Sequence, residues 1–343
     1  MALDPAVLGL AAARYGLAPQ ALHPLHGGNF SHVYGFTRDG AASVLRITPP
    51  NADVDAADMR AILAWVQVLD AHGAPVAGPV LSVAGRLVET LDHATGCYLV
   101  TAVKQARGQL AETLPYDRWS DALFQAWGRA AGRMHAIAQA HAPTDPVLRL
   151  PEWDQTGNCF NEPFPAALAG TPIARHLAQV RAHLATLPRD PSAYGVIHAD
   201  FHAANFFVDP ETATLAVFDF DDCAQGWYAM DIAMALFDVL VVYPRPDRTA
   251  FAAHFLTHYL AGYLREKPLD AFWAAELPHF LKLLEINIYG QVYHDHDPAD
   301  TTSWVGKFLG PYDGGTHDRQ RRIERGEPYV DLDFARILET ARP

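Results

Sequence analysis

The sequence predicts an α+β protein of two lobes, in which a small antiparallel sheet carrying one helix precedes a larger, mainly helical lobe. Three observations indicate this class: short apolar runs separated by glycine turns fill the first hundred residues, helical periodicity prevails from residue 117 onward, and 343 residues exceed the usual length of one domain. We expect an N-terminal lobe over 1–103, a hinge over 104–108 and a C-terminal lobe over 109–343.

The N-terminal lobe is predicted to contain a β-hairpin. Residues 33–36 and 43–47 are short apolar runs on either side of Arg38-Asp39-Gly40. A turn of this composition between two such runs is typical of antiparallel strands.

A helix is expected to follow the hairpin and to cross over the sheet. Residues 58–72 place apolar side chains at helical spacing, and Gly73 stands where a helix would end. Short strands are then predicted at 79–83, 86–91 and 97–103.

Charge and composition exclude several classes of partner. Asp and Glu outnumber Lys and Arg by 39 to 26, which disfavours binding to nucleic acid or to anionic membranes. No basic leader or long uncharged apolar stretch is present, and the three cysteines are widely spaced. We therefore expect a cytoplasmic protein with reduced thiols that binds neither nucleic acid nor membrane.

Asp200, Asn205 and Asp219 form the set of side chains that phosphoryl transfer requires. Such transfer needs a carboxylate that orients the attacking hydroxyl and accepts its proton, together with oxygen ligands for Mg²⁺. Asn205 follows Asp200 by five residues, and Asp219 ends the apolar run 215–218, which predicts a strand that delivers a carboxylate. A hairpin over this segment would bring the three side chains together.

The spacing of these residues resembles that of the aminoglycoside phosphotransferase, homoserine kinase and choline kinase superfamily, the small-molecule branch of the protein-kinase-like fold. Its catalytic loop has the pattern H-x-D-x-x-x-x-N, which matches residues 198–205. The resemblance implies that Asp200 is the catalytic base, that Asn205 and Asp219 bind Mg²⁺, and that His198 is a structural brace of the loop.

Two further segments resemble the same family. Residues 127–135 are similar to its helix that ends in Leu-His, and Met230-Asp231-Ile-Ala is similar to its D-[IL]-A element. The resemblance implies that Asp231 anchors the catalytic loop from below. His135 is expected to be a packed, hydrogen-bonded side chain rather than a catalyst.

The segment 25–34 resembles the hairpin with which this family covers the nucleotide. The residues that the resemblance places against the phosphates of ATP are Gly27, Gly28, Asn29 and Ser31. Arg46 lies one strand later, where kinases carry the basic residue that pairs with the α- and β-phosphates. Because no lysine precedes Lys104, Arg46 is the only suitably placed base.

The crossover helix departs from the family pattern. A Glu normally pairs with the basic strand residue, and the corresponding position here is Ile62. Asp55 and Asp58 are possible substitutes; otherwise another group, or the nucleotide itself, must hold Arg46.

Acidic residues suggest the chemistry of the acceptor. Asp221 and Asp222 directly follow Asp219, and further aspartates stand at 295, 297 and 300. A negative cleft favours cations, so we expect an acceptor that carries an amine beside its hydroxyl, with a neutral sugar or alcohol as the alternative.

Two C-terminal segments have simpler interpretations. The His and Asp residues of 293–297 favour a solvated or substrate-side loop over a transition-metal site. The basic run 319–322 is expected to be a charged helix face.

The sequence as a whole predicts an ATP- and Mg²⁺-dependent phosphotransferase. Its acceptor would be a hydroxyl of a small molecule, such as an amino alcohol, aminosugar, amino acid or aminoglycoside-like compound. Two alternatives are a bacterial Ser/Thr protein kinase of the homoserine-kinase-like type and a nucleotide-binding pseudokinase that acts as a scaffold.

Overall fold

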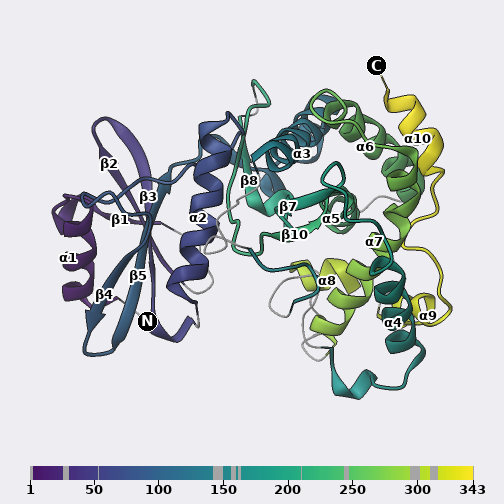
Figure 1. Ribbon diagram of the computed structural model, residues 1–343, viewed down its shortest axis with the longest axis horizontal. Coiled ribbons are helices and arrows are strands. Elements are labelled where there is room, and N and C mark those ends of the chain that lie inside the picture. The colour runs from purple at the N-terminus through teal and green to yellow at the C-terminus, as the bar shows by residue number, and fades with distance from the viewer. Residues whose placement is uncertain are drawn as a thin grey trace. The chain divides into compact units, whose positions relative to one another are not determined.

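The computed structural model describes residues 3–25, 31–52, 54–141, 150–155, 160, 164–209, 211–242, 247–293, 302–309 and 316–342. These residues form two compact units (Figure 1). Unit 1 contains the described residues up to Arg107 together with Ala216–Asp221, and unit 2 contains most of the remainder. The α+β class is therefore confirmed.

Unit 1 is built on an antiparallel sheet of five strands in the order β1-β2-β3-β5-β4. The strands are β1 (His23–Pro24), β2 (His32–Arg38), β3 (Ala41–Thr48), β4 (Glu89–His93) and β5 (Gly96–Lys104). The predicted hairpin is confirmed as β2 and β3. Asp39 and Gly40 join them with φ of 52° and 77°, the left-handed values that a two-residue hairpin turn requires.

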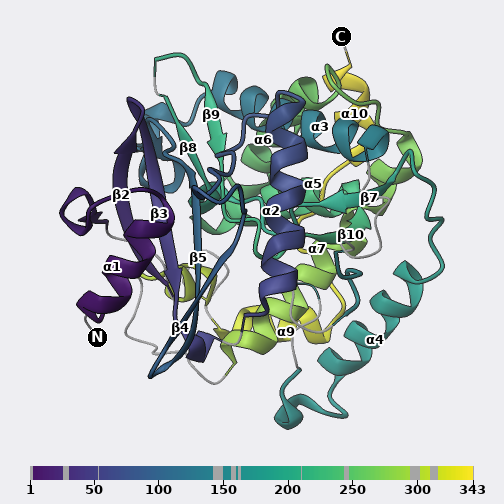
Figure 2. The same cartoon turned by 60° about the vertical axis from the view of Figure 1, so that its left-hand side comes forward.

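Two helices cover opposite faces of this sheet (Figures 1 and 2). Alternate residues of β5 divide between the faces, because side chains on a strand point to opposite sides. Val100 lies in the core with α1 (Pro5–Arg14), whereas Leu99 packs with Met59 of α2 (Ala56–Ala71). α2 is the predicted crossover helix.

Two features differ from the expectation: α1 was not predicted, and one strand was predicted in the wrong place. Asp4 accepts a hydrogen bond from the Ala6 N–H, and Pro5 occupies the first turn, a common way to begin a helix. The strand expected at 79–83 is wrong: only Pro79 forms a bridge, to Val103. The Val80 N–H still donates to the Ala102 carbonyl over 2.8 Å, but the N–H groups of Ser82 and Val83 donate to the carbonyls of Arg86 and Arg14 instead, so the pairing does not extend into a strand.

The segment 216–221 joins unit 1 although it lies far along the chain. It begins in β9 (Leu215–Val217), where the Val217 N–H donates to the Pro75 carbonyl over 2.8 Å, and the Ala77 N–H donates to the Val217 carbonyl over the same distance. This pairing brings Asp219 and Asp221 into the unit that contains β3.

Unit 2 is mainly helical, as predicted. Its helices are α3 (Asp121–His141), α4 (Pro172–Leu184), α5 (Tyr228–Val242), α6 (Arg248–Tyr263), α7 (Ala271–Val292), α8 (Trp304–Leu309), α9 (Thr316–Glu324) and α10 (Phe334–Ala341). α5 is buried from Tyr228 to Val241, which accounts for its nearly unbroken apolar sequence. No described helix is long and apolar enough to span a membrane.

Short strands of unit 2 position the catalytic loop. β7 (Tyr194–Ile197) pairs with β10 (Ala224–Trp227), and β8 (Phe206–Val208) pairs with β6 (Gln109–Leu110). The segment 198–205 connects β7 to β8, so both of its ends are held by strand pairing.

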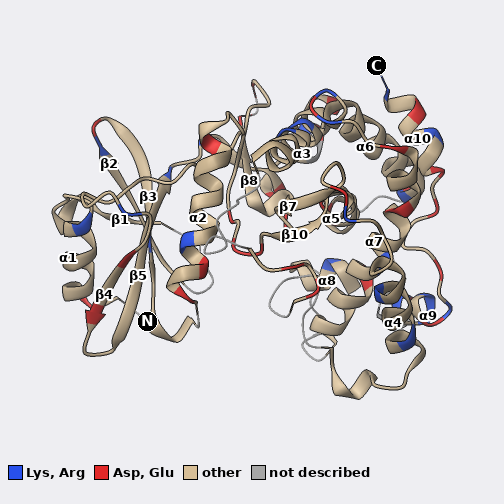
Figure 3. Cartoon of the chain, in the orientation of Figure 1, with Lys and Arg blue, Asp and Glu red and all other residues tan. Residues whose placement is uncertain are grey.

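The basic run on α9 differs from expectation. Arg319 is buried rather than solvated, and its Nη1 lies 3.1 Å from Oε1 of Glu285, which is also buried. Its guanidinium lies over the ring of Phe308. Elsewhere the Lys and Arg residues are distributed over both units (Figure 3).

Candidate active site

The catalytic loop brings Asp200 and Asn205 together. The Asn205 side-chain amide donates to Oδ2 of Asp200 and to the Asp200 carbonyl, each over 2.8 Å. These two hydrogen bonds fix the direction of the carboxylate. The H-x-D-x-x-x-x-N spacing therefore produces a direct contact between its acid and its amide.

His202, which the sequence analysis did not select, contacts the other carboxylate oxygen. Its Nε2 lies 3.2 Å from Oδ1 of Asp200, and its Nδ1 accepts a hydrogen bond from the Ala204 N–H over 3.1 Å. Nε2 carries a proton that faces Asp200. Burial opposes protonation of this ring, but Asp200 outweighs it and the pKa of His202 is raised to about 9. The sequence feature that could have indicated this contact is the position of His202, two residues after the proposed base.

The environment keeps Asp200 ionised. Burial alone would raise its pKa, but His202, His198 and the Asn205 amide lower it, and the net shift is downward. The carboxylate is therefore ready to accept a proton at neutral pH. A quarter of its side-chain surface is exposed, which leaves it accessible to a hydroxyl.

Asp231 holds the start of the loop. Its carboxylate accepts hydrogen bonds from the backbone N–H groups of His198 and Ala199, over 2.9 and 2.8 Å. The predicted anchor is thus present in the geometry. Ala199 has φ of 68°, a left-handed value that is unfavourable for alanine, so its N–H bond to Asp231 helps to hold a strained backbone.

His135 completes this brace and has no solvent exposure. Its Nε2 lies 2.9 Å from Oδ2 of Asp231, and its Nδ1 lies 3.1 Å from the Tyr263 hydroxyl. Burial lowers the pKa of His135, so the ring is neutral, with Nε2–H donating to Asp231 and Nδ1 accepting from Tyr263. The expected packed, hydrogen-bonded role is confirmed.

In unit 1, Arg46 is held by two side chains. Its Nη1 and Nη2 pair with Oδ1 and Oδ2 of Asp221 over 3.0 and 2.5 Å, and its Nε donates to the Ser31 hydroxyl over 3.0 Å. Ser31 also bonds the Thr48 hydroxyl over 2.9 Å. A bidentate carboxylate partner fixes the plane of the guanidinium.

This contact identifies the group that replaces the missing glutamate of α2. Asp55 caps the N-terminus of α2 by accepting from the Ala57 N–H over 2.6 Å, so its carboxylate is used there. Asp221 reaches Arg46 from the segment after β9 instead. We expected Asp221 near the acceptor; its observed partner is Arg46, and an acceptor contact remains a prediction.

The structure describes only some of the other predicted site residues. Asp219 lies in unit 1 with φ of 62°. Burial alone would lower the pKa of Arg46, but the charges of Asp221 and Asp219 raise it, and the net shift is upward. Asp222 is half-buried. The predicted phosphate contacts Gly27, Gly28 and Asn29, and the aspartates at 295, 297 and 300, lie outside the described residues.

The chemistry of these side chains suits a hard cation. Carboxylate and amide oxygens are the ligands that Mg²⁺ prefers. The Asn205 amide nitrogen is occupied by Asp200, whereas its Oδ1 accepts no hydrogen bond within the described part of the chain. That oxygen is therefore available to a metal.

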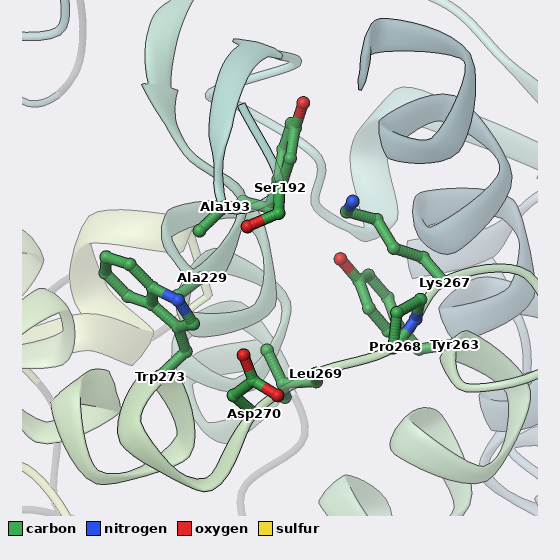
Figure 4. Close-up of a pocket in the computed structure, with 10 residues that line it drawn as sticks. Ser192, Ala193, Ala229, Tyr263, Lys267, Pro268, Leu269, Asp270 and Trp273 are labelled. Carbon is green, nitrogen blue, oxygen red and sulfur yellow. The ribbon is translucent and has the colours of Figure 1, made fainter. Parts of the chain in front are cut away.

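A separate small pocket in unit 2 is lined in part by Tyr263, the residue whose hydroxyl bonds His135 (Figure 4). It encloses about 50 Å³, with Lys267 and Tyr263 on one side and Trp273 on the other. Lys267 is buried, and its ammonium lies over the Tyr228 ring, 4.6 Å from the centroid. None of the lining residues belongs to the catalytic loop, so this pocket is not the transfer site.

An antiparallel sheet unit with a strand arginine, joined to a helical unit whose loop pairs an aspartate with an asparagine, defines a kinase-like phosphotransferase. Residues 21–269 match the phosphotransferase enzyme family, and the chain belongs to that family. It is an enzyme, a kinase that transfers a phosphoryl group to a hydroxyl of a small molecule.

Similar proteins extend the match to nearly the full chain. The amicoumacin kinase of Bacillus subtilis (strain 168) is 29% identical over 338 residues, which cover 97% of this chain and 95% of that protein. A solved amicoumacin kinase, hAmiN, in complex with AMP-PNP, Ca²⁺ and Ami is also 29% identical, with a TM-score of 0.82 and 97% of each chain covered.

A more distant solved structure shares the fold. A microcompartment-associated aminopropanol kinase is 22% identical, with a TM-score of 0.67, and the match covers 94% of this chain and 98% of that one. Together with the family match, this confirms the predicted fold class and the small-molecule kinase branch.

Proposed function

We propose that this enzyme transfers the γ-phosphoryl group of Mg²⁺-bound ATP to a hydroxyl of an amine-bearing small molecule, and that amicoumacin is the first acceptor to test. The observation that carries the proposal is the Asp200–Asn205 contact in the braced catalytic loop. The full-length similarity to amicoumacin kinases, one of them bound to AMP-PNP and Ca²⁺, supports both the nucleotide and the acceptor.

Asp200 would act as the base. Its ionised carboxylate, oriented by Asn205 and His202, would accept the proton of the acceptor hydroxyl as that oxygen attacks the γ-phosphorus. The brace from Asp231 would keep the loop in place, so that the carboxylate need not reorient during transfer.

Arg46 would contact the α- and β-phosphates. Its charge is permanent, and beside their bonds to Asp221 its Nη1 and Nη2 each retain a second N–H that can donate to a phosphate oxygen. Asn205 and Asp219 would hold Mg²⁺, which neutralises phosphate charge when it is bound.

The acidic surroundings of the base support an amine on the acceptor. Burial opposes protonation of His202, but the negative charges of Asp200, Asp238 and Glu112 together raise its pKa to about 9. Glu112 is exposed and therefore free to face a ligand. A local excess of negative charge attracts an ammonium group and disfavours anionic acceptors.

A matched panel of acceptors tests the proposal. ADP release and the mass of the product would be measured with amicoumacin, with aminopropanol and with propanediol, the neutral counterpart of aminopropanol, at low and high salt. We expect amicoumacin or aminopropanol to be phosphorylated, with a preference over propanediol that weakens as salt screens the charges. A preference for the neutral alcohol at both salt concentrations would refute the amine requirement.

A further inference from the structure

Two histidines and one glutamate converge in unit 2, outside the catalytic loop, where α4 packs against α7. His183 lies in the last turn of α4, while Glu276 and His279 are three residues apart on α7. Nε2 of His183 lies 2.7 Å from Oε2 of Glu276, and Nδ1 of His279 lies 2.9 Å from the same oxygen. The three ligand atoms are all within 4.8 Å of one another.

The carboxylate of this cluster is buried, whereas its two histidines are partly exposed, His183 at 38% and His279 at 44%. The Glu276 side chain is only 12% exposed, and among the described residues its ion-pair partners are the two histidines, with no Lys or Arg. Nδ1 of His279 is buried and makes no hydrogen bond of good geometry to a described residue, although it lies so close to the carboxylate. A buried carboxylate without a permanent cation is costly.

The imidazoles are arranged as ligands rather than as a pair of cations. Their ring centroids are 4.1 Å apart, a separation at which two charged rings repel each other. Neutral imidazole is the form that binds a metal.

We propose that His183, Glu276 and His279 form a binding site for a divalent transition-metal ion, for which Zn²⁺ is the best match. Two imidazole nitrogens and one carboxylate oxygen are a common Zn²⁺ ligand set with a fourth position open to water, and nitrogen ligands disfavour Mg²⁺ and Ca²⁺. The three-residue spacing of Glu276 and His279 places both on one face of α7.

The observed distances require only a small adjustment. Bonds of about 2.0–2.1 Å to a tetrahedral ion separate neighbouring ligand atoms by roughly 3.3 Å. The present separations of 2.7 and 2.9 Å would therefore open by about half an ångström, within the reach of side-chain rotation. The fold already brings the ligands from two helices to one point.

A second cluster provides a matched comparison. Asp121 on α3 and His254 and His258 on α6 also approach one another, but Asp121 and His254 are more than half exposed. Nδ1 of His258 already contacts the Gln125 side chain over 3.3 Å. Substitutions there change the same residue types without touching the proposed site.

A bound ion would link α4 to α7 through its ligands. α4 precedes β7, which leads into the catalytic loop, so the ion would stabilise the helical support of that loop. Because binding to the folded state alone stabilises it by mass action, saturation with Zn²⁺ should raise the melting temperature by about 5 °C.

The experiment uses the full chain without a histidine tag, stripped with a chelator and titrated with Co²⁺ in the absence of nucleotide. We expect one equivalent of Co²⁺ to produce the strong visible absorption of a four-coordinate ion, and one equivalent of Zn²⁺ to abolish it. The double variant His183→Ala/His279→Ala should lose both the absorption and the Zn²⁺-dependent rise in melting temperature.

Two variants make the result decisive. His254→Ala/His258→Ala should bind Co²⁺ as the wild type does, and Glu276→Gln should weaken binding by at least about tenfold while leaving the fold intact by circular dichroism. The proposal is overturned if the wild type shows no four-coordinate Co²⁺ absorption, or if the absorption survives in His183→Ala/His279→Ala and disappears in His254→Ala/His258→Ala.

Discussion

Arg46 and Asp221 illustrate how a missing residue is replaced at the scale of single side chains. Ile62 stands where the family pattern expects an acidic partner, and the carboxylate comes instead from Asp221, 175 residues after Arg46. A sequence pattern identified the arginine because its strand position is local. The carboxylate that pairs with it was not identifiable, because the contact depends on how the segment after β9 joins unit 1.

Arg46 should act through charge and geometry together. Arg46→Ala removes the charge-assisted hydrogen bonds to phosphate, so we expect the KM for ATP to rise by about 10- to 100-fold. Arg46→Lys keeps the charge but loses the fork, and its KM should lie between that of Arg46→Ala and the wild type. Steady-state kinetics with varied ATP provides the measurement, and wild-type KM values for both variants would remove Arg46 from the site.

Lys267 should impose a pH dependence on stability. Burial lowers the pKa of Lys267 to about 8. No carboxylate of the described residues pairs with the ammonium to offset this effect. Below this pH the lysine is protonated in the folded and unfolded states, and the cost of burying the charge is fully present. Between about pH 8 and 10.4 the unfolded chain retains the proton and the folded chain does not, so stability increases with pH.

The variant Lys267→Met removes this cost. It should be more stable than the wild type by about 2 kcal/mol at neutral pH, and the advantage should shrink as the pH rises toward about 10. Urea denaturation at several pH values measures the difference. Lys307→Met, at an exposed position of α8, is the control for the loss of one positive charge. A constant difference between Lys267→Met and wild type across this range would contradict the assignment.

At the scale of elements, the catalytic loop depends on groups from two helices. Asp231 comes from α5 and His135 from α3. Asp238, about two turns further along α5, accepts from the Ala203 N–H over 3.0 Å. The sequence identified Asp231 and His135 through family motifs. Asp238 and His202 belong to neither of these motifs, and their roles become apparent only when the loop is folded over α5.

The packing of α3 against α6 should be sensitive to one glycine. A Cβ at Gly128 would overlap the Tyr259 carbonyl oxygen, so the two helix backbones are in close approach. Gly128→Ala should destabilise the protein by about 2–3 kcal/mol, because either the helices separate or their backbones distort. Denaturant unfolding measures this change.

Gly9→Ala in α1 is the matched control. Its added Cβ would meet only Pro19, at an ordinary 3.8 Å, and alanine is the better helix former by about 1 kcal/mol. The substitution should therefore be neutral or stabilising. Equal destabilisation by the two changes would show that helical glycines are needed for a reason other than backbone approach.

The elements that sequence reasoning missed have identifiable physical causes. α1 begins with a capping aspartate and a proline, but its apolar residues do not form a distinct stripe, so periodicity alone did not reveal it. Arg319 was assigned to solvent because arginine is seldom buried. Its burial depends on Glu285, a partner 34 residues away on α7.

At the scale of the whole molecule, fold and enzyme class were predictable because the motifs are local and ordered along the chain. Family membership and the match over 97% of the chain to an amicoumacin kinase confirm both. The acceptor was not predictable in this way, because a small-molecule site is generally built from side chains of segments that are distant in the sequence. The aspartates at 295, 297 and 300, on which part of that hypothesis rested, lie outside the described residues.

The most direct test of the central claim is a comparison of Asp200→Asn with the wild type. Phosphorylated product and ADP would be quantified with amicoumacin and Mg²⁺-ATP, and ATP binding would be measured separately by calorimetry. Loss of the base should lower the rate of transfer by about 10²–10⁴-fold, while the Kd for ATP changes by less than about threefold, because the phosphate contacts lie elsewhere. Transfer by Asp200→Asn within about tenfold of the wild-type rate would contradict the role of Asp200 as the base.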